Sequence, residues 1–307
     1  MHRVLISAPA HPVLKERMEM AGYEVLDHPS IDRQQFESMI HDLHGLIIST
    51  RIPIHADLLE RATKLQWIGR LGSGLEHIDL KAAAAKGIRV FSSPEGNCGA
   101  VGEHALGLLL NLQHKILKSA LEVRDGKLIR DANSGVELNG KTIGIIGFGN
   151  TGRAFARVLG GFDVTILAHD KYLAGFGGQQ VKEASKEQIL RYSDVISLHL
   201  PLTEETHHYA DQTFFEAMER KPFFINTSRG VVHDTQALID ALQNNRVAGA
   251  GLDVLEKEDL LAYTTEEKKQ FDFLVHHPGV IITPHIAGYS IESFYKMSAV
   301  LADKLGL

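Results

Sequence analysis

Cysteine, tryptophan and proline are scarce in this sequence of 307 residues, which contains one, one and nine of them. The single cysteine, Cys98, cannot form an internal disulfide, so we expect a protein of the reducing cytoplasm. The first residues contain too short an apolar run for a secretory signal peptide. The chain is long enough for two domains.

Long hydrophobic runs and an excess of positive charge are also missing. No stretch approaches the roughly 20 apolar residues that a membrane-spanning helix needs. The 32 basic and 38 acidic residues leave a net charge of −6, which gives no reason to expect nucleic acid or an anionic membrane as a partner. The 17 histidines are scattered without the spacing of a metal-binding cluster, so we predict no metal site.

Glycine is plentiful, and three of the 28 glycines form the pattern G-x-G-x-x-G: Gly147, Gly149 and Gly152. The pattern follows Thr142–Ile146, an apolar run typical of a buried strand, and precedes a helical stretch with one apolar face. A second predicted strand, Val164–Leu167, ends close to Asp170, about 20 residues beyond the motif. This order is typical of a unit that binds a dinucleotide.

Each glycine has a physical purpose in such a site. Gly147 permits a tight turn out of the strand, Gly149 lets a pyrophosphate approach the bare backbone, and Gly152 lets the helix pack closely on the sheet. The N-terminus of the helix presents free N–H groups and the positive end of its dipole to the phosphates. The alternative is a glycine-rich turn that binds nothing.

Asp170 stands where an acid can accept hydrogen bonds from the ribose hydroxyls of the adenosine. A carboxylate at this point would repel a 2′-phosphate, so the sequence predicts NAD rather than NADP as the cofactor. Two basic neighbours, His169 and Lys171, act against that preference.

Short apolar runs alternate with helical patterns on both sides of the motif, as in parallel α/β folds. Before the motif, the predicted strands are Val4–Ser7, Glu24–Leu26, Gly45–Ser49, Trp67–Arg70 and Arg89–Phe91. The helices expected between them are Pro12–Ala21, Arg33–His41, Ala56–Ala62 and Leu80–Lys86. From the motif onward, the predicted strands are Thr142–Ile146, Val164–Leu167, Val195–Leu200, Phe223–Asn226, Gly249–Val254 and Val280–Thr283.

A long helix, Ala100–Arg124, is predicted between these two regions and is apolar on most sides. Such a helix must be buried, either within its own domain or against a partner chain. Asp234 is expected to cap a helix over Thr235–Gln243. We expect Glu256–Gln270 to be a loop or a surface helix, and Ile291–Leu305 to be a helix that packs back on the first domain.

The predicted fold class is therefore α/β, with two Rossmann-like or flavodoxin-like parallel sheets. We expect an NAD-binding Rossmann domain over residues 98–285. It is inserted into a substrate-binding (catalytic) domain formed by residues 1–97 and 286–307.

Ligands of parallel sheets bind beyond the carboxyl ends of the strands. Three polar residues follow such ends: Arg229 in INTSRG, Glu258 in GLDVLEKED and His285 in ITPHIAG. Beside a nicotinamide, they suit hydride transfer to the carbonyl of an anionic acid. The histidine would supply the proton, the carboxylate would orient the imidazole, and the arginine would bind the substrate. Each also has an ordinary alternative: a surface cation, part of a solvated charged run, and a loop histidine beside a proline.

Six ordered motifs that cover nearly the whole chain resemble those of the D-isomer-specific 2-hydroxyacid dehydrogenases. They are RLGSGLEHID at 70–79, the glycine motif at 147–152, HLPLTEETHH at 199–208, INTSRGVVHD at 225–234, GAGLDVLEKED at 249–259 and TPHIAG at 283–288. Within this family the chain is most similar to the short branch that acts on D-3-phosphoglycerate.

The resemblance implies that His285 is the acid/base, Glu258 its partner and Arg229 the substrate anchor. Besides the glycines, it implies cofactor contacts for Asn150, Thr151, Asp170, Thr227, Ser228, Asp253 and Gly288, with Asp253 near the nicotinamide amide. It implies substrate contacts for Arg51, Ser73, Gly74 and Asn97, with the carboxylate held by the backbone N–H groups of Ser73 and Gly74. It also implies a homodimer through the nucleotide domain.

Departures from the family pattern leave the substrate undecided. Asp259 replaces the proline that usually follows the glutamate, and Ser49 stands where phosphoglycerate enzymes often have an arginine, although Arg51 is nearby. The leading expectation is oxidation of D-3-phosphoglycerate in serine biosynthesis. One alternative is a hydroxypyruvate or glyoxylate reductase. An alternative of another class is an NAD-sensing protein that resembles the corepressors of this fold.

Overall fold

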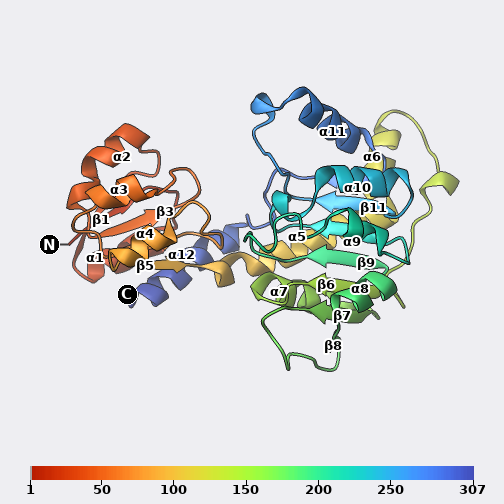
Figure 1. The fold of residues 1–307 in the computed structure, drawn as a ribbon, viewed down its shortest axis with the longest axis horizontal. Helices are drawn as coiled ribbons and strands as arrows, with labels where there is room; N and C mark the ends of the chain where they lie inside the picture. The colour runs from red at the N-terminus through yellow and green to blue at the C-terminus, as the bar shows by residue number, and fades with distance from the viewer. Residues whose placement is uncertain (1) are drawn as a thin grey trace. The chain divides into compact units, whose positions relative to one another are not determined.

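The computed structural model describes residues 2–307 (Figure 1). The chain divides into two compact units: unit 1 is the part up to Ala100 together with Gly288–Leu307, and unit 2 is Val101–Ala287. Each unit contains one sheet, and the paired strands of both sheets are parallel. The predicted fold class, two parallel α/β domains with one inserted into the other, is therefore confirmed.

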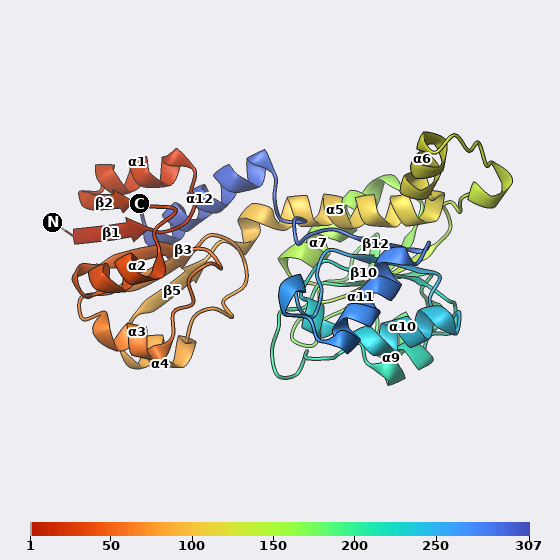
Figure 2. The same ribbon diagram turned by 90° about the horizontal axis from the view of Figure 1, so that it is seen from above.

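The sheet of unit 1 has five strands in the order β2-β1-β3-β4-β5, which is the flavodoxin-like order. These strands are β1 (His2–Ile6), β2 (Tyr23–Asp27), β3 (Gly45–Ile48), β4 (Trp67–Arg70) and β5 (Arg89–Ser92). The helices of this unit, apart from the start of α5, are α1 (Pro12–Met20), α2 (Arg33–Met39), α3 (Ala56–Arg61), α4 (Leu80–Ala85) and α12 (Ile291–Leu305). In Figure 2, α1 and α12 lie on one face of the sheet, and α2, α3 and α4 lie on the other.

Alternating side chains of β1, an interior strand, contribute to a core on each face of this sheet. Leu5 packs in the core that contains residues of α2, α3 and α4, whereas Val4 and Ile6 pack in the core that contains Leu301 of α12. The expected return of the C-terminal helix to the first domain is thus confirmed.

The sheet of unit 2 has seven strands in the order β12-β11-β10-β9-β6-β7-β8. They are β6 (Thr142–Ile146), β7 (Thr165–His169), β8 (Val181–Glu183), β9 (Val195–Leu198), β10 (Phe223–Asn226), β11 (Gly249–Leu252) and β12 (Val280–Ile282). The chain runs from β6 outward to β7 and β8, then crosses to β9 on the other side of β6. Ligands of such sheets bind at this reversal of strand order.

The predicted single helix over Ala100–Arg124 is wrong in its start and in its continuity. The structure has α5 (Pro94–His114) and α6 (Ile116–Arg124), separated by Lys115 in a left-handed conformation with a φ of 52°. The start at Pro94 is favourable because proline is preorganised for the first turn of a helix. Several α5 side chains enter the core of unit 2, whereas α6 buries none of its residues.

The remaining α-helices of unit 2 are α7 (Asn150–Val158), α8 (Lys186–Tyr192), α9 (Gln212–Glu216), α10 (Thr235–Gln243) and α11 (Thr265–His276). Short 3-10 turns are η1 (Ile40–Asp42), η2 (Asp131–Asn133), η3 (Leu159–Gly161), η4 (Gly230–Val232) and η5 (Leu260–Ala262). The charged segment expected to be a loop or a surface helix contains the start of α11. From His2 onward, no helix is long and apolar enough to cross a membrane.

Candidate active site

The glycine turn between β6 and α7 has the geometry that its sequence predicts. Gly147 has a φ of +90°, and a Cβ there would come within 2.4 Å of the carbonyl oxygen of His199. A Cβ on Gly152 would come within 2.1 Å of the carbonyl oxygen of Gly147, whereas one on Gly149 would meet no atom within 4 Å. The outer glycines therefore permit close packing, and the middle glycine leaves open space before the helix.

The N-terminus of α7 begins at Asn150 and Thr151, directly after this open space. Gly149 is the N-cap residue, and no side chain caps the helix. The first N–H groups of a helix lack partners within the helix and can hold an anionic group. The residues present thus fit the pyrophosphate of a dinucleotide.

Asp170 lies beside this turn, directly after β7. One carboxylate oxygen accepts the N–H of Phe148 at 2.8 Å, and the other accepts the N–H groups of Tyr172 at 2.9 Å and Leu173 at 3.1 Å. The acid is therefore held in one orientation by the glycine turn and by its own loop. The predicted glycines and Asp170 come together in the structure.

The loop that carries Thr227, Ser228 and Arg229 is ordered by Asn226, which is fully buried at the end of β10. The amide oxygen of Asn226 accepts the N–H of Ser228 at 2.9 Å and its hydroxyl at 2.7 Å. The amide nitrogen donates to the carbonyl of Arg229 at 2.9 Å. The buried Thr227 hydroxyl has no partner and is available to a ligand.

His285 and Glu258 are directly paired. Nδ1 of His285 lies 2.9 and 3.1 Å from the two carboxylate oxygens of Glu258. Both side chains are about half exposed, 44% and 49%. Burial acts to raise the pKa of Glu258. The hydrogen bond from His285 and the nearby charges of His285 and Arg229 outweigh it, so the pKa lies below its ordinary value. The three predicted residues therefore come together.

Asp253 holds the loop that carries His285. Its buried carboxylate accepts the hydroxyl of Thr283 at 2.5 Å and the N–H groups of Ile286 at 3.0 Å and Ala287 at 2.7 Å. Its carbonyl oxygen accepts the N–H of His285 at 2.8 Å. Asp253 is predicted to lie near a nicotinamide amide, and in the structure both of its carboxylate oxygens accept hydrogen bonds from this loop.

His104 of α5 extends the same network. Its Nε2 lies 2.9 Å from the hydroxyl of Thr283 and 3.5 Å from a carboxylate oxygen of Asp253. His104 and Thr283 were not among the residues predicted for the site, and Asn226 was not predicted to order the loop that carries Arg229. Asn226 ends β10 and Thr283 directly follows β12, both close in sequence to predicted site residues, which is a usable signal. His104 lies on a distant helix and has no such signal.

The residues predicted to bind substrate in unit 1 have varied surroundings. The guanidinium of Arg51 donates to the carbonyls of Ile31 at 2.5 Å, Ser7 at 3.0 Å and Pro29 at 3.2 Å. Ser73 is exposed and Gly74 is partly buried in the turn after β4.

Asn97, on the first turns of α5, has a buried amide oxygen without a hydrogen-bond partner. A Cβ on Gly288 would come within 2.7 Å of the amide nitrogen of Asn97, so these two residues adjoin. The unpaired oxygen is a group that a bound ligand could satisfy.

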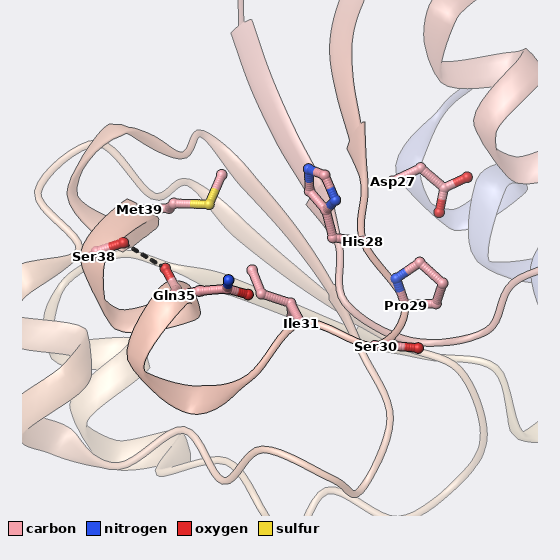
Figure 3. Close-up of a pocket in the computed structure, with 8 residues that line it drawn as sticks. All are labelled: Asp27, His28, Pro29, Ser30, Ile31, Gln35, Ser38 and Met39. Atoms are coloured by element: carbon pink, nitrogen blue, oxygen red, sulfur yellow. Dashed lines mark hydrogen bonds between the residues drawn. The ribbon is translucent and has the colours of Figure 1, made fainter.

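A cavity of about 560 Å³ in unit 1 opens between α2 and the loop after β2 (Figure 3). It is lined by Asp27, His28, Pro29, Ser30, Ile31, Gln35, Ser38 and Met39. These eight include no residue predicted for the site. Arg51 lies next to the cavity, because it donates hydrogen bonds to the carbonyls of Ile31 and Pro29 in the loop after β2. Within residues 2–307, no group of three or more His, Cys, Asp or Glu side chains could hold a metal ion.

The chain matches the profile of the D-isomer specific 2-hydroxyacid dehydrogenase, NAD binding domain, over residues 106–287. It is 32% identical over 298 residues to D-3-phosphoglycerate dehydrogenase of Homo sapiens. This match covers 95% of the chain and 54% of the human protein. It is 33% identical over 308 residues to glyoxylate reductase of Thermofilum pendens. This match covers 98% of the chain and 88% of the reductase.

A solved structure of D-lactate dehydrogenase from Aquifex aeolicus, complexed with NAD and lactic acid, is also similar. The identity is 28%, the TM-score is 0.83, and the match covers 99% of this chain and 94% of that one. The chain therefore belongs to the D-isomer-specific 2-hydroxyacid dehydrogenase family, and the predicted nicotinamide cofactor is confirmed at the level of that family. The chain spans about half the length of the phosphoglycerate dehydrogenases that it matches.

Proposed function

We propose that this protein is an NAD-dependent D-2-hydroxyacid dehydrogenase. It interconverts a small anionic 2-hydroxy acid and the corresponding 2-keto acid. The observation that carries this proposal is the pairing of His285 with Glu258, near Arg229, in the unit that matches an NAD-binding domain.

The three side chains divide the work of this reaction. Glu258 accepts a hydrogen bond from Nδ1 of His285, which leaves Nε2 to exchange a proton with the oxygen at the reacting carbon. Arg229 binds the carboxylate of the substrate through charge-assisted hydrogen bonds. The nicotinamide, when bound, donates or accepts the hydride. Asp253 and Thr283 hold His285 in the required place.

Most of the proposed cofactor contacts lie in unit 2, and unit 1 would contribute substrate contacts in addition to Arg229 of unit 2. The cofactor contacts are assigned to Gly147, Gly149, Asn150, Thr151, Gly152, Asp170, Thr227 and Ser228, with Asp253 and Gly288 at the nicotinamide end. The substrate contacts in unit 1 are assigned to Ser73, Gly74 and Asn97. The open space at Gly149 and the unpaired oxygens of Thr227 and Asn97 support these assignments.

For the substrate, we propose D-3-phosphoglycerate and 3-phosphohydroxypyruvate, hence a role in serine biosynthesis in the cytoplasm. The names of several of the most similar relatives support this choice. One observation favours hydroxypyruvate or glyoxylate instead. The guanidinium of Arg51, the candidate for a phosphate, already donates to three backbone carbonyls.

We also propose a homodimer through unit 2. Helix α6 buries no residue in the single chain, and its apolar side chains are exposed: Ile116, Leu117, Leu121 and Val123. An apolar helix face of this kind is a liability in a monomer and is suited to burial against a second copy.

The experiment is NADH oxidation and NAD reduction with phosphohydroxypyruvate, hydroxypyruvate, glyoxylate and pyruvate, and with the corresponding hydroxy acids. Turnover of the phosphorylated acid at a kcat/KM at least tenfold above the others would support the phosphoglycerate assignment. Preference for hydroxypyruvate or glyoxylate would support the alternative. Tight NADH binding without turnover of any acid would overturn the dehydrogenase assignment in favour of an NAD-sensing protein.

A further inference from the structure

Three exposed side chains join two loops of unit 2 at the edge of the glycine turn. One carboxylate oxygen of Glu205 accepts a hydrogen bond from Nζ of Lys171 at 2.7 Å and another from the hydroxyl of Tyr172 at 2.6 Å. Lys171 and Tyr172 directly follow Asp170. We call this group of Lys171, Tyr172 and Glu205 the rim clasp.

The rim clasp lies beside the reversal of strand order in the sheet. Lys171 and Tyr172 follow β7, and Glu205 lies in the turn after β9, while β7 and β9 pair with β6 on its two sides. The carboxyl ends of all three strands are on one edge of the sheet, where ligands bind. The two loops joined by the clasp therefore flank the turn that would hold the cofactor.

The turn that carries Glu205 is held by internal hydrogen bonds. The hydroxyl of Thr206 donates to the carbonyl of Pro201 at 2.6 Å and accepts the N–H of Thr203 at 2.8 Å. Asp170 is equally constrained by the N–H of Phe148 in the glycine turn. The carboxylate of Asp170 and the backbone that carries Glu205 are therefore both held by local hydrogen bonds.

Lys171 and Glu205 stabilise each other in their charged forms. Their hydrogen bond is the largest cause both of the raised pKa of Lys171 and of the lowered pKa of Glu205. The pair is about 60% exposed on each side, 61% and 55%, so salt weakens it. A phosphate on the adenosine ribose would need a cation near Asp170. Lys171 follows Asp170, but its ammonium is already paired with Glu205.

We propose that Glu205 is a specificity-determining residue that disfavours NADP by keeping Lys171 in the rim clasp. The inference rests on the proposed placement of the adenosine ribose at Asp170. A 2′-phosphate brings almost two negative charges next to Asp170 and Glu205. Lys171 can neutralise them fully only if it gives up part or all of its pairing with Glu205. Without Glu205, the flexible lysine is free to bind the phosphate.

The experiment measures the dissociation constants of NADH and NADPH by nicotinamide fluorescence, which requires no substrate. Four variants are compared with the unaltered chain: Glu205→Gln, Glu204→Gln, Lys171→Ala and the double variant Glu205→Gln/Lys171→Ala. Glu204→Gln is the matched control, because Glu204 is an exposed acid in the same turn and lies outside the rim clasp. Circular-dichroism melting shows that each variant is folded.

Glu205→Gln should tighten NADPH binding by roughly three- to tenfold, as expected for one exposed charge pair facing a phosphate. NADH binding should change by less than about twofold, and high salt should reduce the NADPH gain. The gain should disappear in the double variant and be absent from Glu204→Gln.

Three results would overturn the role of Glu205: no change in the ratio of the two dissociation constants, an equal gain in Glu204→Gln, or a gain that survives the loss of Lys171. Failure of the unaltered chain to bind either dinucleotide would overturn the cofactor site itself. Binding of both with an unchanged ratio would overturn the inference alone and leave the proposed dehydrogenase function standing.

Discussion

The backbone of His285 adopts a left-handed conformation, with a φ of 56°, that is unfavourable for a residue with a side chain. Two hydrogen bonds to Asp253 help to offset the cost of this conformation. The N–H of His285 donates to the carbonyl of Asp253, and the hydroxyl of Thr283 donates to its carboxylate. The orientation of the histidine toward Glu258 therefore depends on Asp253, a buried acid that was predicted to contact the cofactor.

Replacing His285 by alanine tests its role as the acid/base. His285→Ala should lower kcat by about 10²-fold or more, because the proton donor is lost. NADH binding should remain within a few fold, since the glycine turn and Asp170 are untouched. Steady-state kinetics and fluorescence titration measure the two effects. Unchanged kcat with a bound substrate would contradict the assignment.

Replacing Thr283 by valine, which has nearly the same shape, tests whether the hydrogen bonds of Asp253 position His285. Thr283→Val removes the hydroxyl that donates to the buried carboxylate of Asp253, and should destabilise the protein by about 1–3 kcal/mol. It should also lower kcat more than it raises KM, since His285 loses its support. Thr283→Ser keeps the hydroxyl and should recover most of both losses. Urea denaturation and steady-state kinetics provide the measurements, and equal behaviour of the two variants would contradict the role.

At the scale of elements, the break between α5 and α6 changes what each helix can do. Helix α5 contributes Ala105 and Leu109 to the core and carries His104 toward Asp253. Helix α6 departs at Lys115 and leaves its apolar side chains exposed. Internal burial, one of the two possibilities predicted for one long helix, thus applies to α5, and the interface remains a proposal for α6.

The proposed dimer can be tested on α6. Leu117→Asp together with Leu121→Asp should convert a dimer to a monomer, because charges would enter an apolar interface. The matched control is Leu261→Asp, since Leu261 is fully exposed in the same unit. Light scattering coupled to size-exclusion chromatography measures the mass. A dimer that survives the double substitution would place the interface elsewhere.

Two buried histidines connect the stability of the molecule to pH. Burial lowers the pKa of His199 to about 3 and that of His233 to about 4, both below the ordinary value of 6.5. Below pH 6.5 the unfolded chain takes up protons that the native chain does not bind. The contribution of these two histidines to the free energy of unfolding is therefore fully present above this pH and is lost as the pH falls toward 4.

The free energy of unfolding should fall by about 1.4 kcal/mol per pH unit for each of these histidines between roughly pH 6 and pH 4. Urea denaturation at pH 7, 6 and 5 measures the slope. His199→Gln removes one of the two groups and should reduce the slope by that amount, whatever its effect on stability at pH 7. An identical slope in the variant would show that the native state protonates His199.

Much of the fold could be predicted from local pattern. Strands β6 and β10 and helices α10 and α12 have the predicted bounds, because apolar periodicity and caps such as Asp234 are local properties. The edge strand β8 was not predicted, since a three-residue strand with exposed charges has no periodicity. The left-handed turn at Lys115 was also unpredictable, because lysine has no preference for that conformation.

The sequence by itself determined the family, the glycine turn with Asp170, and the choice of Arg229, Glu258 and His285 as candidate site residues. These are encoded in contiguous motifs whose side-chain chemistry is independent of distant contacts. Only the tertiary structure decided that Asp253 and Thr283 hold His285, that Arg51 binds backbone carbonyls, and that Glu205 pairs with Lys171. Each of these depends on groups far apart in the chain that come within hydrogen-bond distance, about 3 Å, only when the sheets have formed.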